Sequence, residues 1–256
     1  MLLSVVLQAA LCGSVFAQAA PSTFVLQPQP LTAAELAARY TPAQVEILEK
    51  LNRRDRAHLV RVDPPVPGLV VPAVWEEGAL AFSPFPAEWA AAADLAKVIV
   101  VDQPIQAFAA YERGQLVRWG PVSTGRAETP TPSGLFYLTW RARSRRSTDN
   151  AAWLLEWYFN FVNERGVSFH KFDLPGYPGS HACVRLRERD AQWVYEWGEQ
   201  WTLDATRRLV TTTGTPVLIL GTYAYKAPAP WVDLAVAMQT VQLPDVLPPP
   251  ASPGRK

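Results

Sequence analysis

Ser180-His181-Ala182-Cys183-Val184-Arg185 is the segment of this chain with the most specific chemical pattern. Cys183 is one of only two cysteines, and the other, Cys12, lies in an apolar leader that we expect to be cleaved. His170 and His181 are two of the chain's three histidines, and both fall within the thirteen residues before Cys183. A thiol attacks as the thiolate, and a nearby imidazole can remove its proton. The pattern therefore predicts a catalytic Cys–His pair.

The segment His170–Arg185 resembles the active-site signature of the L,D-transpeptidases, the YkuD-like catalytic domains. That signature is a histidine, a variable loop, and then Ser-His-Gly-Cys followed by an apolar residue and Arg or Asn. Similarity continues upstream in Pro121–Gly125 and Thr129–Gly134, and downstream in Gly214–Ile219. The resemblance covers 97–223 and implies a mainly β catalytic domain. We expect an antiparallel sandwich or barrel of the L,D-transpeptidase type, with a helix after the active-site cysteine.

The resemblance also implies a role for each residue of the motif. Cys183 is the expected nucleophile and His170 the base, whose orienting partner is the backbone carbonyl of Lys171. His181 is expected to shape the loop and to hydrogen-bond near the thiol, and Ser180 to hold the turn. These assignments cover nucleophile, base and orienting group, three of the parts that acyl transfer needs.

Oxyanion binding is the fourth part, and we expect the amides of Ala182 and Cys183 to supply it. Ala182 stands where the family most often has glycine. If φ is positive there, the methyl group costs about 1 kcal/mol or more and puts the oxyanion geometry in doubt. Two interpretations of Arg185 stay open, a bidentate pair with a substrate carboxylate or a brace for its own loop.

The implied reaction has two steps on peptidoglycan stem peptides, which serve as donor and as acceptor. The thiolate attacks the third stem residue and expels D-Ala, and an amine of a neighbouring stem resolves the thioester to a 3→3 cross-link. No metal or cofactor is expected.

One alternative is a carboxypeptidase or amidase of the same family, and another is a wall-binding module with an impaired site. A third is zinc bound by His170, His181 and Cys183, although structural zinc needs a fourth ligand and only Asp173 offers one.

Composition favours a globular exported protein. The 256 residues allow one sizeable domain and a smaller one, and the chain is 49% hydrophobic and 18% charged. A net charge of +1 gives no reason to expect nucleic acid or an anionic membrane as partner.

Residues 1–19 end in Ala17-Gln18-Ala19 and predict a signal peptide, although no Lys or Arg precedes the apolar run. A lipid anchor at Cys12 is the alternative, but Leu11 is too large for its position. No later stretch predicts a transmembrane helix, so we expect export to the periplasm or cell envelope.

Four regions flank or precede the expected catalytic domain. Residues 20–31 are predicted to be a linker, 73–96 a connector rich in proline and aromatic residues, and 224–256 an extended or disordered proline-rich tail. Region 32–72 carries two capping boxes, Thr32 with Glu35 and Thr41 with Gln44, and predicts a small helical region. Its end faintly resembles a LysM repeat, but a helical hairpin packed on the catalytic domain is the favoured interpretation.

Within the catalytic domain, short β-branched and aromatic runs predict strands and one amphipathic run predicts a helix. The strands are expected at 98–101, 106–111, 116–122, 135–140, 167–169 and 216–220, and the helix at 190–201. The basic cluster Arg141–Arg146 is interpreted as a solvated loop, with recognition of substrate carboxylates as the alternative. The aromatic segment 153–159 is interpreted as core packing, with a lid over the site, which the family resemblance implies, as the alternative.

Overall fold

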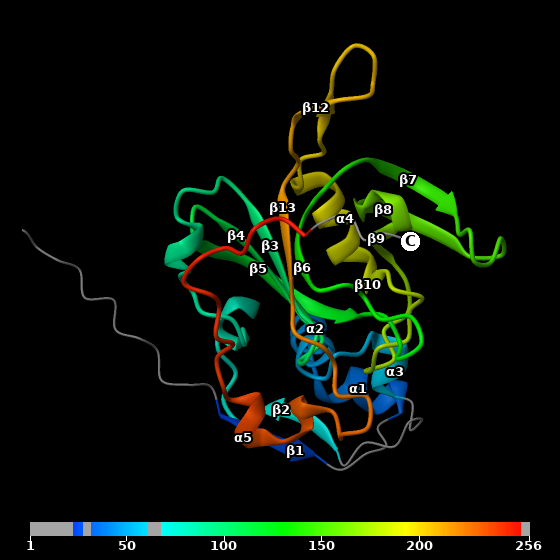
Figure 1. The fold of residues 1–256 in the computed structure, drawn as a ribbon. Coiled ribbons are helices and arrows are strands. Elements are labelled where there is room, and N and C mark those ends of the chain that lie inside the picture. The colour runs from blue at the N-terminus through cyan, green and yellow to red at the C-terminus, as the bar shows by residue number, and fades with distance from the viewer. Residues whose placement is uncertain (1–22, 28–31, 61–67, 252–256) are drawn as a thin grey trace, which may run out of the picture.

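The computed structural model describes residues 23–27, 32–60 and 68–251. The expected signal peptide lies outside these residues. The described chain contains a nine-stranded sheet and two small two-stranded sheets (Figure 1). In spatial order the strands of the large sheet are β6 (Gly134–Tyr137), β13 (Pro216–Leu220), β3 (Val98–Asp102), β4 (Ala107–Glu112), β5 (Gln115–Ser123), β10 (Val184–Leu186), β9 (Val167–Lys171), β8 (Leu154–Val162) and β7 (Arg141–Arg146).

The prediction of a mainly β catalytic domain is confirmed, but the sheet is mixed rather than wholly antiparallel. Strands β13 and β3 run parallel, as do β10 and β9, and the other neighbours are antiparallel. The hairpin between β4 and β5 turns through Arg113 and Gly114, whose φ angles are 47° and 77°. Two residues with positive φ make a tight turn that matches the twist of the strands.

The basic cluster Arg141–Arg146 is strand β7, and the interpretation as a solvated loop is wrong. It pairs antiparallel with β8, which includes most of the aromatic segment 153–159. Phe159 of this strand packs in the inner core, as the aromatic density of the segment indicated. The two strands form a hairpin that projects from the body of the molecule (Figure 1). The guanidinium of Arg143 lies 3.4 Å from the ring centre of Trp157, so an arginine on this hairpin packs against an aromatic ring. Contacts of this kind let a charged run form an edge strand, and charge on an edge strand discourages aggregation.

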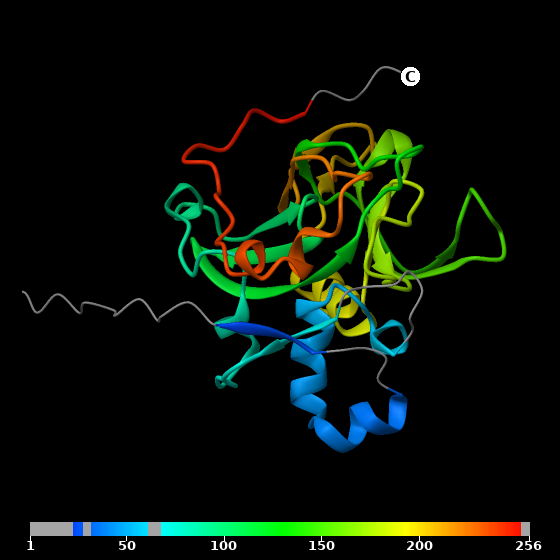
Figure 2. The same cartoon turned by 90° about the horizontal axis from the view of Figure 1, so that it is seen from below.

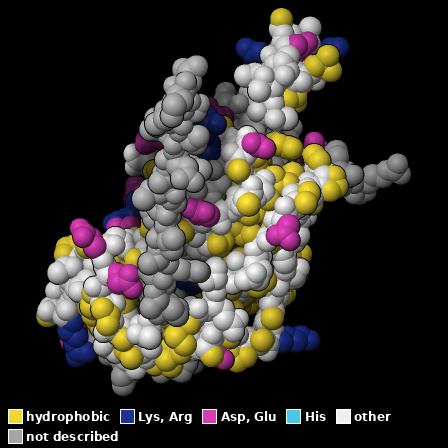
Figure 3. All heavy atoms as spheres, turned by 90° about the vertical axis from the view of Figure 1, so that its left-hand side faces the viewer, with side chains coloured by type: hydrophobic (Ala, Val, Ile, Leu, Met, Phe, Trp, Pro, Cys, Tyr) yellow, Lys and Arg dark blue, Asp and Glu magenta, His cyan; other side chains and the backbone are white. Residues whose placement is uncertain are grey.

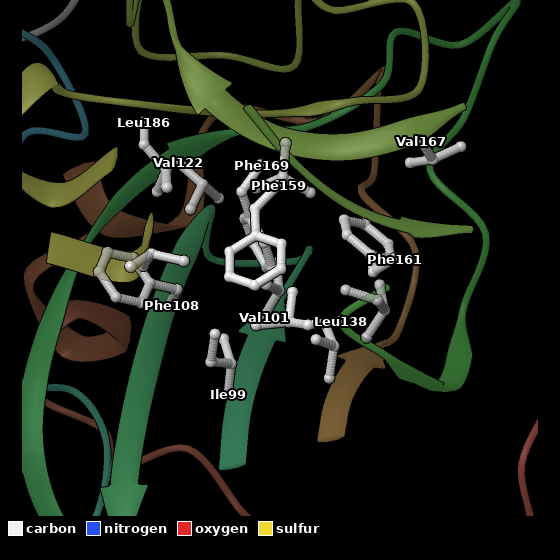
Figure 4. Packing of buried hydrophobic residues seen from close by; sticks show 14 of the residues in the cluster. Ile99, Val101, Phe108, Val122, Leu138, Phe159, Phe161, Val167, Phe169 and Leu186 are labelled. Atoms are coloured by element: carbon white, nitrogen blue, oxygen red, sulfur yellow. The ribbon is translucent and has the colours of Figure 1, made fainter. Parts of the chain in front are cut away.

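The large sheet curls and buries a hydrophobic cluster on its inner face. Phe159, Phe161 and Phe169 from β8 and β9 meet Ile99 and Val101 from β3 there (Figure 4). Helix α4 (Glu188–Trp197) follows the cysteine strand as predicted and closes this cluster with its buried face. The curl thus fixes β9 and β10, the strands of the predicted site, against a rigid core.

The outer face of the sheet buries a second cluster. The connector 73–96 contributes Phe82, Phe85 and Trp89, each at most 5% exposed, as expected for a segment that lies across apolar surface. It contains two short 3-10 helices, η1 (Ala79–Phe82) and η2 (Ala90–Ala92). This segment therefore belongs to the body of the catalytic domain.

The N-terminal region is a small unit of its own. Its helices are α1 (Ala33–Arg39), α2 (Pro42–Leu51) and α3 (Arg56–Leu59). Both predicted capping boxes are confirmed. Strand β1 (Phe24–Gln27), inside the expected linker, pairs antiparallel with β2 (Leu69–Pro72). Figure 2 shows this unit on one side of the large sheet.

A buried charge network joins the N-terminal unit to the catalytic domain. Asp190 of α4 is fully buried and accepts hydrogen bonds from Arg118 at 2.8 Å and from Arg187 at 2.7 Å. Arg187 also donates to Glu49 of α2 at 2.8 Å. Burial alone raises the pKa of Asp190, yet the two guanidinium groups hold it below its usual range. Lys50 of α2 is buried beside them, and burial lowers its pKa to about 8.

The C-terminal tail was expected to be extended or disordered, and it packs along the molecule as far as residue 251. It contains η4 (Pro230–Val232) and α5 (Leu234–Ala237). Trp231 is 4% exposed, and the amide of Ala251 donates to the carbonyl of Leu135 at 2.8 Å. Proline content predicted an extended chain, but buried aromatic contacts give that chain a fixed place.

A second hairpin, β11 (Thr202–Leu203) with β12 (Val210–Thr212), projects at the top of Figure 1. Figure 3 shows charged side chains of both signs at its tip, beside the exposed Leu209 and Val210. Of the described helices, none combines the length and the apolar character that crossing a bilayer requires.

Replacing Asp190 tests the charge network. Asp190→Ala leaves Arg187 and Arg118 without their buried counter-charge, so we expect the free energy of unfolding to fall by about 3–5 kcal/mol. Chemical denaturation measures this change. The control is Glu196→Ala on the exposed face of the same helix, for which we expect a change within about 0.5 kcal/mol. Equal effects of the two substitutions would contradict the network.

Candidate active site

The parallel pairing of β9 and β10 places the motif residues next to one another. Arg185 lies opposite His170, and Val184 lies opposite Phe169. Phe169 and Val184 face the inner core. Because side chains alternate along a strand, His170 and Arg185 face the other way, and so does Ser168, two residues before His170. The sequence motif therefore becomes a compact cluster on one face of two adjacent strands.

Cys183 immediately precedes β10 and is half-buried among polar groups. It is the only free cysteine in the part of the chain that the structure describes. The hydroxyl of Ser168 donates to its sulfur at 3.5 Å, and the thiol donates to the carbonyl of Gly166 at 3.8 Å. The thiol thus lies in a polar site rather than in hydrocarbon.

His170 is positioned as a neutral base. Its Nδ1 lies 3.0 Å from the carbonyl oxygen of Lys171, the contact that the resemblance implied. A carbonyl can only accept, so Nδ1 carries the proton and Nε2 is left with its lone pair. The side chain is 3% exposed, and burial together with the positive charge of Arg185 lowers its pKa to about 4, against the opposing hydrogen bond to Lys171. The imidazole is therefore neutral at neutral pH.

Cys183 and His170 line the same small cavity. Among the described residues no hydrogen bond joins the sulfur to the imidazole. The cavity has a volume of about 30 Å³, which is room for one or two water molecules. Ser147, Asp149 and Trp153, at the tip of the β7–β8 hairpin, also line it.

The thiol of Cys183 is protonated at neutral pH. Burial raises the pKa of Cys183, while Ser168 lowers it in part through its hydroxyl and its backbone amide. Thiol and imidazole are therefore a neutral pair here. General-base removal of the proton by His170 fits this state better than a preformed thiolate–imidazolium ion pair.

The loop before Cys183 is held by the segment after β5. The amide of Ser180 donates to the carbonyl of Thr124 at 3.1 Å, and the hydroxyl of Thr131 donates to the carbonyl of Ala182 at 2.8 Å. The hydroxyl of Ser180 donates to the carbonyl of Cys183. The upstream stretches of family resemblance therefore support the turn on which the cysteine sits.

Ala182 has a φ of 85°, in the region that favours glycine. At this angle the methyl group costs about 1 kcal/mol. The methyl is 6% exposed and packs with the inner core, which offsets part of that strain. The loop therefore adopts the backbone turn of a glycine despite the substitution.

The other two motif residues contact aromatic rings. The His181 ring lies 5.2 Å from the ring of Trp153, and its Nδ1 is buried without a hydrogen-bond partner in the described chain. The guanidinium of Arg185 lies 4.4 Å from the ring centre of Phe172. Among the described residues it forms no ion pair with a carboxylate. Its contact with Phe172 braces its own loop and leaves its donors available to a ligand.

The zinc hypothesis finds no ligand set. The described residues contain no cluster of three or more His, Cys, Asp or Glu side chains arranged to hold a metal ion. His170 uses Nδ1 on a carbonyl, and the thiol contacts Ser168 and Gly166. These contacts suit acid–base chemistry rather than tetrahedral metal binding.

The N-terminal unit also holds the active-site loop, which the sequence did not indicate. Asp55 accepts a hydrogen bond from the amide of Leu174 at 2.8 Å through Oδ2, and its own amide donates to the carbonyl of Leu174 at 3.1 Å. Arg54 forms a β-bridge with Pro175. Gly176 has a φ of 88°, and a side chain there would meet Arg54 at 2.7 Å. Hydrogen bonds therefore hold the loop between His170 and Cys183 from two sides. The N-terminal unit holds its first half, and the segment after β5 holds its second half.

A mainly β domain in which one thiol and the imidazoles of His170 and His181 line a shared cavity has the parts of a cysteine-dependent enzyme site. Residues 96–219 match the family model described as the L,D-transpeptidase catalytic domain, YkuD. This segment of the chain therefore belongs to the L,D-transpeptidase family. No curated protein was found to match the chain.

Several solved structures are similar in part. An L,D-transpeptidase from Stackebrandtia nassauensis shares 23% identity with a TM-score of 0.42, over 52% of this chain and 59% of its own. L,D-transpeptidase 3 from Mycobacterium tuberculosis, solved with a faropenem-derived adduct, shares 23% identity with a TM-score of 0.39, over 49% and 60%. An L,D-transpeptidase from Xylanimonas cellulosilytica shares 22% with a TM-score of 0.43, over 71% and 81%. The chain thus spans about three fifths of the length of the first two.

Replacing Asp55 tests the contact between the N-terminal unit and the loop. Asp55→Ala removes the acceptor of the Leu174 amide and the N-cap of α3, so we expect the free energy of unfolding to fall by about 1–3 kcal/mol. Hydrogen exchange should accelerate at 174–176. Thr41→Ala is the matched control, because it removes the N-cap of α2 in the same unit without touching the loop. Unchanged exchange at 174–176 in Asp55→Ala would show that the contact does not hold the loop.

The pH dependence of alkylation tests the neutral thiol. Because burial raises the pKa of Cys183, its alkylation by iodoacetamide should titrate above the ordinary thiol pKa of about 8.5. Mass analysis of the peptide that carries Cys183 follows the reaction, and Cys183→Ser is the blank. A reactivity plateau below about pH 7, which a low-pKa thiolate produces, would contradict the neutral pair.

Proposed function

We propose that this chain is an exported L,D-transpeptidase that transfers acyl groups of peptidoglycan stem peptides through Cys183. The observation that carries the proposal is the orientation of His170. Its Nδ1–H is held by the carbonyl of Lys171, so the free Nε2 lies in the same cavity as the lone thiol. The family to which residues 96–219 belong supplies the class of reaction.

The first half-reaction forms a thioester. Nε2 of His170 takes the thiol proton as the sulfur attacks the carbonyl of the third stem residue, a diamino acid. The amides of Ala182 and Cys183 are the nearest donors for the resulting oxyanion, and one such donor is worth about 3–4 kcal/mol. Collapse of the intermediate breaks the peptide bond, and the amine of the leaving D-Ala takes the proton back from His170.

The second half-reaction resolves the thioester. An amine of a neighbouring stem loses a proton to His170 and attacks the carbonyl, and the sulfur leaves and recovers that proton. The product is a 3→3 cross-link and the free enzyme. Ser147, Asp149 and Trp153 at the tip of the β7–β8 hairpin line the cavity and shield part of it from water. Shielding of the thioester favours an amine acceptor over hydrolysis.

Arg185 and the export signal complete the proposal. The guanidinium of Arg185 has no carboxylate partner among the described residues and lies beside the cavity, where it can pair with a stem-peptide carboxylate. The apolar leader with its Ala17-Gln18-Ala19 end supports export to the periplasm or cell envelope, where this substrate lies.

Muropeptides with tetrapeptide stems test the reaction, with the products read by mass. We expect stem dimers with loss of D-Ala in the wild type and none with Cys183→Ala. His170→Ala should reduce the rate by about 10²–10⁴-fold, because it removes the general base. Glu196→Ala, on the exposed face of α4, is the surface control and should retain the activity.

Three outcomes separate the candidates. Loss of D-Ala without dimers would identify a carboxypeptidase instead. No turnover, together with no covalent adduct from a carbapenem on the wild type, would leave only a wall-binding module. A carbapenem adduct that is present in the wild type and absent in Cys183→Ala supports Cys183 as the nucleophile, because a β-lactam acylates an activated thiol.

A further inference from the structure

Ser168 is a buried hydroxyl beside the reacting sulfur, with no assigned role. It lies on β9 two residues before His170, on the same face of the strand. Its side chain is fully buried, and its hydroxyl donates to the sulfur of Cys183 at 3.5 Å. In the described chain it is the only side chain recorded as a donor to that sulfur.

The two contacts of the sulfur favour opposite protonation states. The carbonyl of Gly166 can only accept, so its contact with the sulfur at 3.8 Å favours the protonated thiol. The hydroxyl of Ser168 donates, and a hydrogen bond to an anion is roughly twice as strong as one to a neutral acceptor. The hydrogen bond from Ser168 to the sulfur therefore becomes stronger once the thiol proton has left.

A polar network fixes the groups behind the sulfur. The hydroxyl of Tyr158 donates to the carbonyl of Gly166 at 3.0 Å, and the amide of Asn160 donates to that hydroxyl at 3.1 Å. Thr139 donates to Asn160 at 2.7 Å. The carbonyl of Gly166 has two lone pairs and accepts from Tyr158 and from the thiol. The network thus fixes the groups that surround the sulfur.

We propose that Ser168 is a further catalytic residue, which donates a hydrogen bond to the Cys183 thiolate as His170 removes the proton. The S–H bond breaks, the proton moves to Nε2 of His170, and the O–H bond of Ser168 stays intact. The buried position makes this donor necessary, because water cannot reach the sulfur from that side. The proposal rests on Cys183 as the nucleophile of the proposed function.

The experiment is the pH profile of Cys183 alkylation by iodoacetamide in the full chain, with the Cys183 peptide read by mass. Ser168→Ala removes the donor with little change in volume. We expect its titration to move to higher pH and its rate near pH 7 to fall about tenfold or more, the effect of a hydrogen bond to a charged group. At pH values above both titrations the two rates should converge.

Two further variants keep the result interpretable. Ser168→Thr keeps the hydroxyl, so its profile should return toward that of the wild type. Thr215→Val removes another hydroxyl, on a residue 3% exposed that accepts from the amide of Glu199 at 2.9 Å, and should leave the profile unchanged. An unshifted profile in folded Ser168→Ala, or an equal shift in Thr215→Val, would overturn the proposal. If Ser168→Ala does not fold, a shifted profile in Ser168→Thr overturns it and an unshifted one supports it.

The same variants separate this proposal from the proposed function. Alkylation requires no peptidoglycan, so a shifted profile in an enzyme without muropeptide turnover would support Ser168 and reject the transpeptidase. Where turnover occurs, Ser168→Ala should lower kcat about tenfold with little change in KM, because Ser168 touches the sulfur and not the substrate. A change confined to KM would contradict a role in thiolate formation.

Discussion

The parallel pairing of β9 with β10 is the contact on which the site depends. These strands are separated in sequence by the loop 172–183, and their register places Arg185 opposite His170. A shift of one residue would turn the imidazole into the core and Phe169 out of it, so the register is fixed by the burial of Phe169 and Val184. Catalytic geometry here therefore follows from hydrophobic packing on the opposite face of the same strands.

The loop between those strands has little regular structure and takes its shape from outside. On one side Thr124 and Thr131 hold the backbone of Ser180 and Ala182. On the other side Asp55 holds Leu174. The N-terminal unit is thus part of the support of the site, and the buried charges around Asp190 keep that unit in place. Because removing one member of such a network leaves a charge buried alone, the two units are coupled in stability.

The sequence predicted those features that a local pattern encodes. The motif located Cys183 and His170, the capping boxes predicted α1 and α2, and short apolar and aromatic runs predicted six of the nine strands of the large sheet. Arg141–Arg146 was misjudged because charge is a local signal, whereas its strand pairing with β8 depends on a partner. Ser168 and Asp55 were missed for a related reason. A serine two residues before a histidine carries no signal until the register of β10 is known, and Asp55 lies more than a hundred residues from the loop that it holds.

Burial has opposed consequences for the two reacting groups. It lowers the pKa of His170 and so preserves a neutral base, but it raises the pKa of Cys183 and so makes the nucleophile harder to form. Water that reached the site would lower the pKa of Cys183, but it would also raise the pKa of His170. It would expose the thioester to hydrolysis as well. A buried donor beside the sulfur avoids that conflict, because it stabilises the thiolate without bringing water to the imidazole. The position of Ser168, behind the sulfur and on the same strand as the base, meets this requirement.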